Sequence, residues 1–320
     1  MKKTLFALCL LVLCAYSGRA VAQTESTSTA TITFFRTPSA LLPGQFSVSA
    51  TKKARFAKGN LQYLASQNKW RFAANQWEAI GANPGNNTSM SRNNQSNWID
   101  LFAWGTSGWS GGGNSNYQPW TADGTDAQYG PAIGTMAANA SWSDAAGTKN
   151  YDWGTYVFNE GPNKGYRVLT KSEWNYIFSE RTNAAALFGM GRLHGVNGLY
   201  ILPDNWDWSK VSTQTSKVGF VWTPSSTATD FTHNIIPETD AGETLWAAME
   251  TLGAVFLPCG GYRSNGGTNV KNQNASFHYW TSTAVDANDA YVIRYNEGNW
   301  TPNVSRLRSY GFSVRLVQIF

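Results

Sequence analysis

Cys259 and His278 are the residues of this chain whose types could support nucleophilic chemistry. A cysteine attacks as its thiolate, and a nearby imidazole can accept the thiol proton. Cys259 lies in the segment LPCGG, and His278 is the histidine nearest to it in the sequence. A cysteine between an apolar run and glycines also fits a small buried side chain that does no chemistry. We favour the buried interpretation and keep catalysis by Cys259 as an alternative.

Two further patterns could belong to a hydrolase. Residues 108–112 read GWSGG and match the G-x-S-x-G elbow, which needs a strand before the serine and a helix after it. The residues that follow, GGGNSNYQPW, cannot form that helix. Asp204 and Asp207 in LPDNWDW are predicted to cap turns, while a glycosidase pair formed by these carboxylates stays open. We therefore assign no catalytic residue.

The distribution of metal-ligating side chains predicts no metal site. The histidines are scattered along the chain, as His194, His233 and His278. This arrangement lacks the His and Cys spacing of a zinc site. The group Asp286, Asn288 and Asp289 is too sparse to specify calcium by itself. The expectation is a protein without a metal or another cofactor.

The amino-terminal segment predicts a secretory signal peptide over residues 1–22. It reads MKKTLFALCLLVLCAYSGRAVAQ, with lysines first, an apolar stretch next and an Ala-Val-Ala cleavage site last. Cys9 and Cys14 each follow a bulky leucine, which argues against lipoprotein processing. No later apolar run approaches the roughly 18 residues of a membrane helix. We expect a secreted, periplasmic or outer-surface protein without a membrane span.

The composition of the remaining chain narrows the classes of partner. Without the signal peptide it carries 22 basic and 20 acidic residues, with no Lys/Arg cluster. Nucleic acid is therefore not an expected partner, because a phosphate backbone needs concentrated positive charge. Only Cys259 remains, so no intramolecular disulfide can form. Aromatic residues make up 14% of the chain, and most of these rings are expected in the core of one large domain.

The local patterns predict many short strands, few helices and long loops. Residues 23–44 are expected to form a flexible leader before a domain over 45–320. Thr170 and Glu173 form a capping box at the start of an amphipathic helix, and a second helix is expected over residues 243–252. The expected strands lie at 46–50, 54–64, 69–73, 199–202, 255–257, 279–283, 290–295 and 312–317. Between residues 81 and 147, loops are expected to be held by Trp98, Trp104, Trp109, Trp120 and Trp142.

The last part of the domain, residues 255–320, predicts a strand frame that carries a polar surface. Strand-like runs alternate there with segments rich in Asn, Gly and Ser. Aromatic and Arg side chains dominate interface energies, and Asn and Ser supply adaptable hydrogen bonds. The predicted ligand-binding residues are Ser264, Asn265, Asn269, Phe277, His278, Asn288, Tyr291, Arg294, Asn296, Asn299, Trp300, Asn303, Ser305 and Arg306.

Several motifs of this chain resemble a known family. Residues 165–174 (GYRVLTKSEW), 257–264 (LPCGGYRS) and 311–317 (GFSVRLV) are similar, in order and spacing, to segments of the formylglycine-generating enzyme (sulfatase-modifying factor) superfamily. The segments ATKKARFAKGNLQY, GVNGLYILPDNW, GAVFLP and YWTST resemble secreted bacterial paralogous-domain proteins and the variable proteins of diversity-generating retroelements. These motifs span nearly the whole domain. The resemblance implies an α+β domain of C-type-lectin-like fold, with small twisted sheets, two main helices and long loops.

The resemblance also bears on function, which a shared fold does not settle. In the retroelement-diversified branch the ligand face lies in the C-terminal stretch, so the resemblance implies a secreted or surface-displayed protein that binds a protein or glycan receptor there. The first alternative is a metal-independent carbohydrate-binding module, in which Trp faces stack on sugar rings. The second is an enzyme of the superfamily that uses Cys259. The enzymatic branch has paired late cysteines, and this chain has one.

Overall fold

The computed structural model of this 320-residue chain describes its strands, its helices and part of its loops. The described residues are 33–34, 41–64, 67, 69–81, 98–105, 152–154, 165–225, 227, 230–263, 270–286, 289–296, 299–308 and 310–320. All of them belong to one unit, Thr31–Phe320. The predicted signal peptide, 1–22, lies outside the described residues. Among those described, no helix has both the length and the apolar character needed to cross a bilayer.

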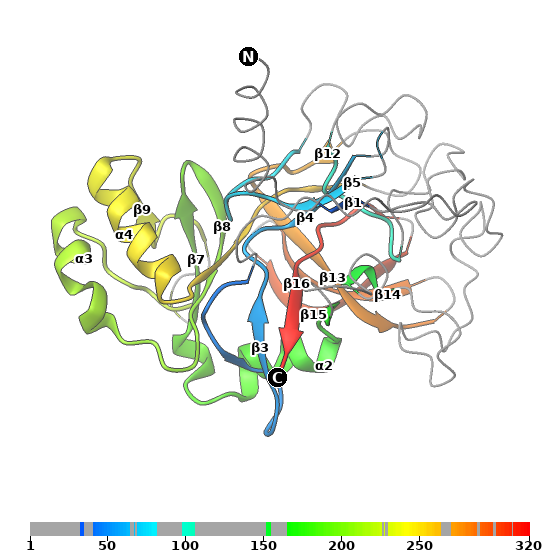
Figure 1. Ribbon diagram of the computed structural model, residues 1–320, viewed down its shortest axis with the longest axis horizontal. Helices are drawn as coiled ribbons and strands as arrows, with labels where there is room; N and C mark the ends of the chain where they lie inside the picture. Colours follow the sequence, from blue (N-terminus) through cyan, green and yellow to red (C-terminus); the bar gives the residue numbers. More distant parts are fainter. Residues whose placement is uncertain are drawn as a thin grey trace, which may run out of the picture. The chain divides into compact units, whose positions relative to one another are not determined.

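The described strands are short and form five small sheets, so the fold class is α+β (Figure 1). The strands are β1 (Thr33–Phe34), β2 (Phe46–Ser47), β3 (Lys53–Phe56), β4 (Leu61–Leu64), β5 (Lys69–Phe72), β6 (Tyr166–Val168), β7 (Phe188–Leu193), β8 (Val196–Ile201), β9 (Ile235–Ile236), β10 (Val255–Pro258), β11 (Tyr262–Arg263), β12 (Val270–Lys271), β13 (Ser276–Ala284), β14 (Asp289–Asn296), β15 (Asn299–Leu307) and β16 (Leu316–Ile319). Their orders are β1-β5-β4, β10-β8-β7-β9, β11-β12, β13-β14-β15 and β2-β3-β16-β6.

One of these sheets joins the beginning of the domain to its end. β16 lies between β3 and β6 and is antiparallel to both. Val317 faces Phe56 on one side and Arg167 on the other. Figure 1 shows the carboxyl terminus beside β3 for this reason. Pairing residues so distant in sequence closes the fold around a common core.

The predicted flexible leader is partly built into this core. β1 pairs with β5, in parallel, through Thr33 and Phe34. Leu42 is also buried, with its backbone amide bonded to the Phe56 carbonyl oxygen. Two short segments before residue 44 therefore join the described part of the domain, one by strand pairing and one by the burial of Leu42.

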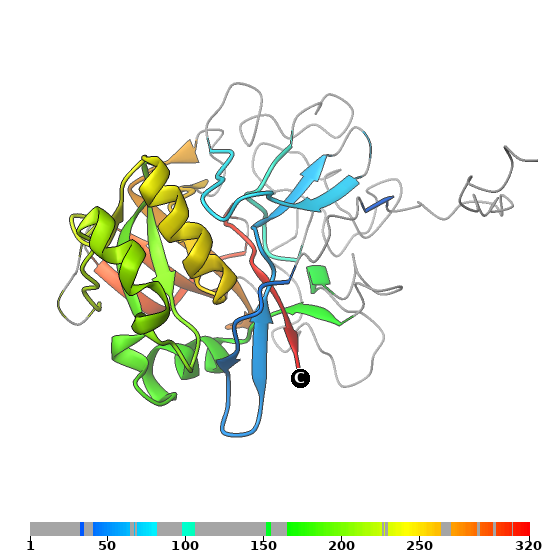
Figure 2. The same ribbon diagram turned by 60° about the vertical axis from the view of Figure 1, so that its left-hand side comes forward.

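A layer of helices covers the β10-β8-β7-β9 sheet, as Figure 2 shows. α4 (Asp240–Thr251) begins after Thr239, whose hydroxyl accepts a hydrogen bond from the Gly242 amide. It confirms the helix predicted over 243–252 and starts three residues earlier. α3 (Ser212–Val218) was not predicted, because its sequence STQTSKV is rich in residues of low helix propensity. Apolar side chains of α4 pack on Tyr200 and Phe256 of the sheet.

Three parts of the strand prediction need correction. Residues 54–64 form two strands, β3 and β4, instead of one, and in the stretch 312–317 a regular strand begins only at β16. Residues 299–307 were assigned to a polar connecting segment but form β15, the third strand beside β13 and β14. The pairing between β14 and β15 shifts register between Val292 and Arg294. A bulge at Pro302 and Asn303 breaks the period-two alternation that identifies strands in a sequence.

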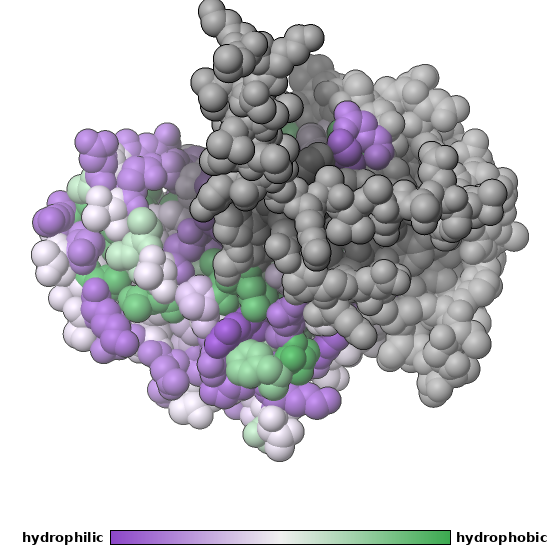
Figure 3. All heavy atoms as spheres, in the orientation of Figure 1, coloured by the Kyte–Doolittle hydropathy of each residue, from purple (hydrophilic) through white to green (hydrophobic). Residues whose placement is uncertain are grey.

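The surface of the described residues is mixed in character. In Figure 3 the hydrophobic residues of the described part of this face form small separate groups among hydrophilic ones. Near the carboxyl terminus, Phe320 is 56% exposed, with the guanidinium of Arg55 lying 5.1 Å from its ring centroid. Single exposed apolar side chains of this kind are ordinary in soluble domains.

Candidate functional site

The β13-β14-β15 sheet holds most of the predicted ligand-binding residues that the structure describes. Its register alternates the side chains between two faces. Phe277, Tyr295 and Trp300 form one cross-strand row, and His278, Arg294 and Thr301 form the adjacent row on the other face. We call these the helix face, which lies against helix α2, and the arginine face, which carries Arg294 and Arg306.

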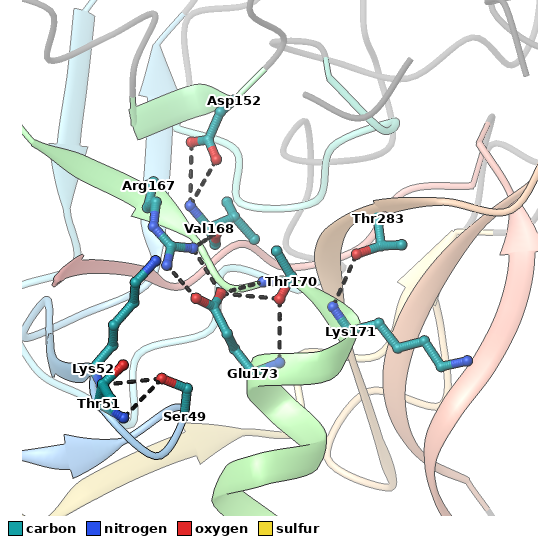
Figure 4. Close-up of polar contacts among 10 residues, drawn as sticks. All are labelled: Ser49, Thr51, Lys52, Asp152, Arg167, Val168, Thr170, Lys171, Glu173 and Thr283. Atoms are coloured by element: carbon teal, nitrogen blue, oxygen red, sulfur yellow. Dashed lines mark hydrogen bonds and ion pairs between the residues drawn. The ribbon is translucent and has the colours of Figure 1, made fainter. Parts of the chain in front are cut away.

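Helix α2 (Lys171–Asn175) is fixed in place by the capping box that the sequence predicts (Figure 4). The Thr170 hydroxyl accepts from the Glu173 amide at 3.2 Å, and the Glu173 carboxylate accepts from the Thr170 amide at 2.9 Å. Arg167 donates from both terminal nitrogens to the same carboxylate. The Lys171 amide donates to the Thr283 hydroxyl at 3.0 Å, which ties the first turn of α2 to β13.

Predicted binding residues on the helix face are engaged by α2 and the π-helical turn Tyr176–Glu180 that continues it. The ammonium of Lys171 lies 3.9 Å from the centroid of the Tyr291 ring, and the Asn303 amide donates to the Asn175 side chain at 3.1 Å. The Trp300 ring meets Phe178 edge-on, with centroids 4.8 Å apart. These contacts give Tyr291, Asn303 and Trp300 a structural role in holding the helix to the sheet.

Phe277 and His278 are buried, so the structure does not support the prediction that they contact a ligand. Phe277 is fully buried and belongs to the apolar cluster under α2. His278 is 3% exposed, and its ring stacks on Phe312 with centroids 4.7 Å apart. Phe277 and His278 lie on opposite faces of β13, and both faces of this strand are covered over most of its length.

The arginine face carries the remaining candidates. Arg294 and Arg306 are both half-buried, and Arg306 stands opposite Ala290 in the register. Asn296 lies at the end of β14, where its side-chain oxygen accepts a hydrogen bond from the Asn272 amide at 3.1 Å. Ser305 pairs with Tyr291, which places its side chain on the helix face instead. Four predicted residues lie outside the described part of the chain, namely Ser264, Asn265, Asn269 and Asn288. Only the backbone of Asn299, which begins β15, is described.

The charge on the arginine face comes from Arg and not from His. Burial, and then the positive charge of Arg306, lower the pKa of His278 to about 3. The imidazole is therefore neutral at physiological pH. Arg306 donates from one terminal nitrogen to the Ser305 carbonyl oxygen at 2.7 Å, which fixes its orientation along β15.

Three residues of this surface were missed in the sequence. Tyr262 and Tyr310 are half-buried, with nearly parallel rings 6.4 Å apart. Tyr262 also lies 4.8 Å from the His278 ring, and Thr301 continues the cross-strand row of Arg294. The alternation of Tyr310 with Phe312 is a period-two signal that could have placed Tyr310 beside the site.

The residues considered for catalysis are buried in the core or bonded to neighbouring segments. Cys259 is 1% exposed, and burial raises the pKa of its thiol well above the usual value. Asp207 accepts from the Ser209 amide at 2.9 Å and caps a turn, as predicted. Asp204 accepts from the Ser47 amide and hydroxyl and from Arg181, so it joins distant segments instead of capping a local turn. Among the described residues, no three His, Cys, Asp or Glu side chains gather as metal ligands would. The G-x-S-x-G match at 108–112 lies outside them.

Comparison of the chain with protein-family models, with curated proteins and with solved structures found no match. The C-type-lectin-like fold and the family resemblance therefore stay predictions.

Proposed function

We propose that this chain is an exported ligand-binding protein of C-type-lectin-like fold, whose arginine face contacts a protein or glycan ligand. The observation that carries the proposal is the group Arg294, Thr301 and Arg306, half-buried on one face of a three-stranded sheet. Arg is among the residue types that contribute most to binding energy at interfaces. By the same proposal, any diversification by a retroelement acts on β14 and β15.

Hydrogen bonds along both edges of β13 hold the sheet beneath this group. β13 pairs with β14 along one edge, and on its other edge the His278 carbonyl oxygen accepts from the Ser313 amide at 3.1 Å. The Trp280 indole donates to the Phe102 carbonyl oxygen at 2.7 Å in the core. Side chains on a fixed frame lose less entropy on binding than side chains on a mobile loop. This favours a binding surface over a merely solvated one.

The proposed surface is narrower than the sequence suggested. Trp300, Tyr291 and Asn303 contact α2 or the turn after it, so they support the sheet from behind. Arg294, Thr301 and Arg306 face the other way. Removing residues of the first kind should change stability, and removing residues of the second kind should change binding.

A matched pair of variants tests the proposal. The first carries Arg294→Ala, Thr301→Ala and Arg306→Ala; the control carries Arg192→Ala, Thr213→Ala and Lys217→Ala, three exposed residues of the β7 and α3 region. Both lose the same side-chain types or charges. The exported protein and both variants are applied to glycan arrays and, with flow cytometry, to bacterial and epithelial cell surfaces. We expect the first variant to bind at least about tenfold more weakly than the unmodified protein. Unchanged binding by this variant would contradict the proposal.

A carbohydrate-binding module is the second candidate, and one observation favours it. Trp206, Trp208 and Trp222 are all half-buried, and the Trp208 centroid lies 5.2 Å from that of Trp206 and 5.4 Å from that of Trp222. Indole rings offer apolar faces on which sugar rings can stack. Trp fluorescence followed during oligosaccharide titration tests this candidate. A response that Trp208→Ala abolishes and that the arginine-face variant preserves would favour it.

A further inference from the structure

The two guanidinium groups of the arginine face have no carboxylate partner among the described residues. The strand register places Arg306 next to Val304 and Arg294 opposite Thr301, on the same face as Val292, which is fully buried. Neither arginine forms an ion pair within the described part of the chain, and the Arg294 Nε is buried there without an acceptor. Buried guanidinium nitrogens normally have acceptors, because the desolvation of an unpaired charge is costly.

The charges around the pair offset it only at one end. Asp289 stands opposite Leu307 and is attracted by Arg306, although the two form no ion pair. Asp286 accepts a hydrogen bond from the Asp289 amide, and Arg308 donates to the Asp289 carbonyl oxygen, so charges of both signs lie at that end. Lys271, which is exposed, stands opposite Tyr262 at the other end. The positive charge of Arg294 is therefore the one that no described carboxylate offsets, while that of Arg306 is offset in part by Asp289.

Aromatic rings border the arginines. Tyr262 packs on His278, which is the cross-strand partner of Arg294, and the Tyr310 ring lies 5.6 Å from the Phe312 ring beneath it. Both tyrosines are half-buried and pack against the edge of the core. A phenol combines a flat apolar face with a hydroxyl that can donate or accept a hydrogen bond.

We propose that Arg294 and Arg306, with Tyr262 and Tyr310 beside them, form a surface that binds the carboxylate or sulfate groups of an acidic polysaccharide. The inference rests on the proposed function and specifies the ligand of that same surface. Guanidinium groups match planar and tetrahedral oxyanions by paired N–H donors. The tyrosines supply a face for the pyranose ring and hydroxyls for its polar edge.

A saccharide fits this surface better than an extended acidic peptide does. A peptide could bind by adding a strand next to β15, which ends the described sheet. Pro302 has no amide to donate, and the register shift at this point interrupts the row of backbone partners. A ligand that binds side chains does not depend on that row. In the test below, binding to an acidic polypeptide is the outcome that would favour a peptide ligand.

The test measures binding of the full exported chain to immobilised polymers by biolayer interferometry. The polymers are polygalacturonate and hyaluronan as carboxylates, chondroitin sulfate as a sulfate, dextran as a neutral glycan, and poly-glutamate as an acidic polypeptide. The variant Arg294→Gln with Arg306→Gln is compared with the control Arg192→Gln with Lys217→Gln, which loses the same net charge elsewhere. The first should lower affinity for an acidic polysaccharide at least about tenfold, and the control should leave it within about twofold.

The results distinguish failure of the anion subsite from failure of the proposed binding surface as a whole. Preference for carboxylated over sulfated polymers, or the reverse, identifies the oxyanion. The anion subsite is overturned if no acidic polysaccharide binds, if both variants lose affinity equally, or if poly-glutamate alone binds. The broader binding surface survives that failure if Thr301→Ala and Tyr262→Ala weaken binding of dextran or of another array glycan. Circular dichroism confirms that each variant is folded.

Discussion

Trp300 and Arg306 lie on opposite faces of the same strand, although six residues apart they would share a face in a regular strand. Trp300 stands opposite Tyr295, on the face that packs against Phe178. Arg306 stands opposite Ala290, on the face that carries Arg294. The register shift between the two pairs reverses the alternation. Trp300 and Arg306 were both predicted to contact a ligand, but they lie on two different surfaces.

The first prediction separates these two roles. Trp300→Ala should lower the free energy of unfolding by about 1–3 kcal/mol, because a half-buried indole leaves a gap beside Phe178. Arg306→Ala should change the free energy of unfolding by no more than about 0.5 kcal/mol, because Arg306 makes no ion pair in the described chain. Urea denaturation followed by Trp fluorescence and circular dichroism measures both. Equal losses would show that Arg306 also holds the sheet together.

The elements that the sequence predicts well have strong local signals. The capping box of Thr170 and Glu173 forms as predicted, and α4 covers nearly all of the predicted second helix. β15 could not be predicted, because Pro302 and the register shift hide its alternation. α3 could not be predicted because its Ser and Thr residues favour other local structures, and only the left-handed Gly219 at its end signals it.

The candidate site was harder to predict than the fold because burial depends on tertiary pairing. His278 and Arg294 are neighbours across two strands. In sequence they look alike as polar residues in a strand, yet His278 is 3% exposed and Arg294 is half-buried. Ser313 pairs with Tyr279 along the other edge of β13, and the ring of its neighbour Phe312 stacks on His278 and covers it. No local pattern records that pairing.

The second prediction concerns Arg315, a fully buried arginine whose donors meet uncharged acceptors. It donates to the Asn60 side chain at 3.0 Å and to the carbonyl oxygens of Lys58 at 2.9 Å and Phe256 at 2.8 Å. Arg315→Leu should lower the free energy of unfolding by about 3 kcal/mol or more, because these buried acceptors would lose their donor. Guanidinium denaturation measures the loss.

Arg192→Leu is the matched control for Arg315→Leu. Arg192 is exposed, and its guanidinium donates to the nearby Asn197 side chain at 2.9 Å. Its replacement should change the free energy of unfolding by no more than about 0.5 kcal/mol. If both variants lost the same stability, the buried network around Arg315 would not be the cause.

The third prediction is that the stability of the protein depends on pH through the protonation of Asp204. Burial alone would raise the pKa of Asp204, but hydrogen bonds from Ser47 and the charge of Arg181 together lower it. A carboxyl whose pKa is lowered by folding stabilises the protein above its unfolded pKa and loses that contribution as the pH falls through the folded pKa. The stabilisation should be complete above about pH 5 and should decline below about pH 4.

Asp204→Asn isolates this contribution. At neutral pH the variant should be about 2 kcal/mol or more less stable than the unmodified protein, because it leaves the buried Arg181 without its counter-charge. The difference between the two proteins should narrow as the pH falls, since protonation of Asp204 produces the same loss. Urea midpoints measured across the acid range report both curves. Parallel curves at every pH would show that Asp204 acts only as a hydrogen-bond acceptor.

The fourth prediction concerns the reactivity of Cys259. The thiol is buried and its pKa is raised by burial, so little thiolate forms and reagents reach it only when the core opens. Iodoacetamide should alkylate Cys259 at least about a hundredfold more slowly in the native protein than in concentrated guanidinium chloride. Peptide mass mapping locates the modification. Cys259→Ala should cost less stability than Cys259→Ser, because serine would bury a hydroxyl in an apolar cluster. Rapid alkylation of the native thiol would reverse this assignment and would make Cys259 a candidate nucleophile again.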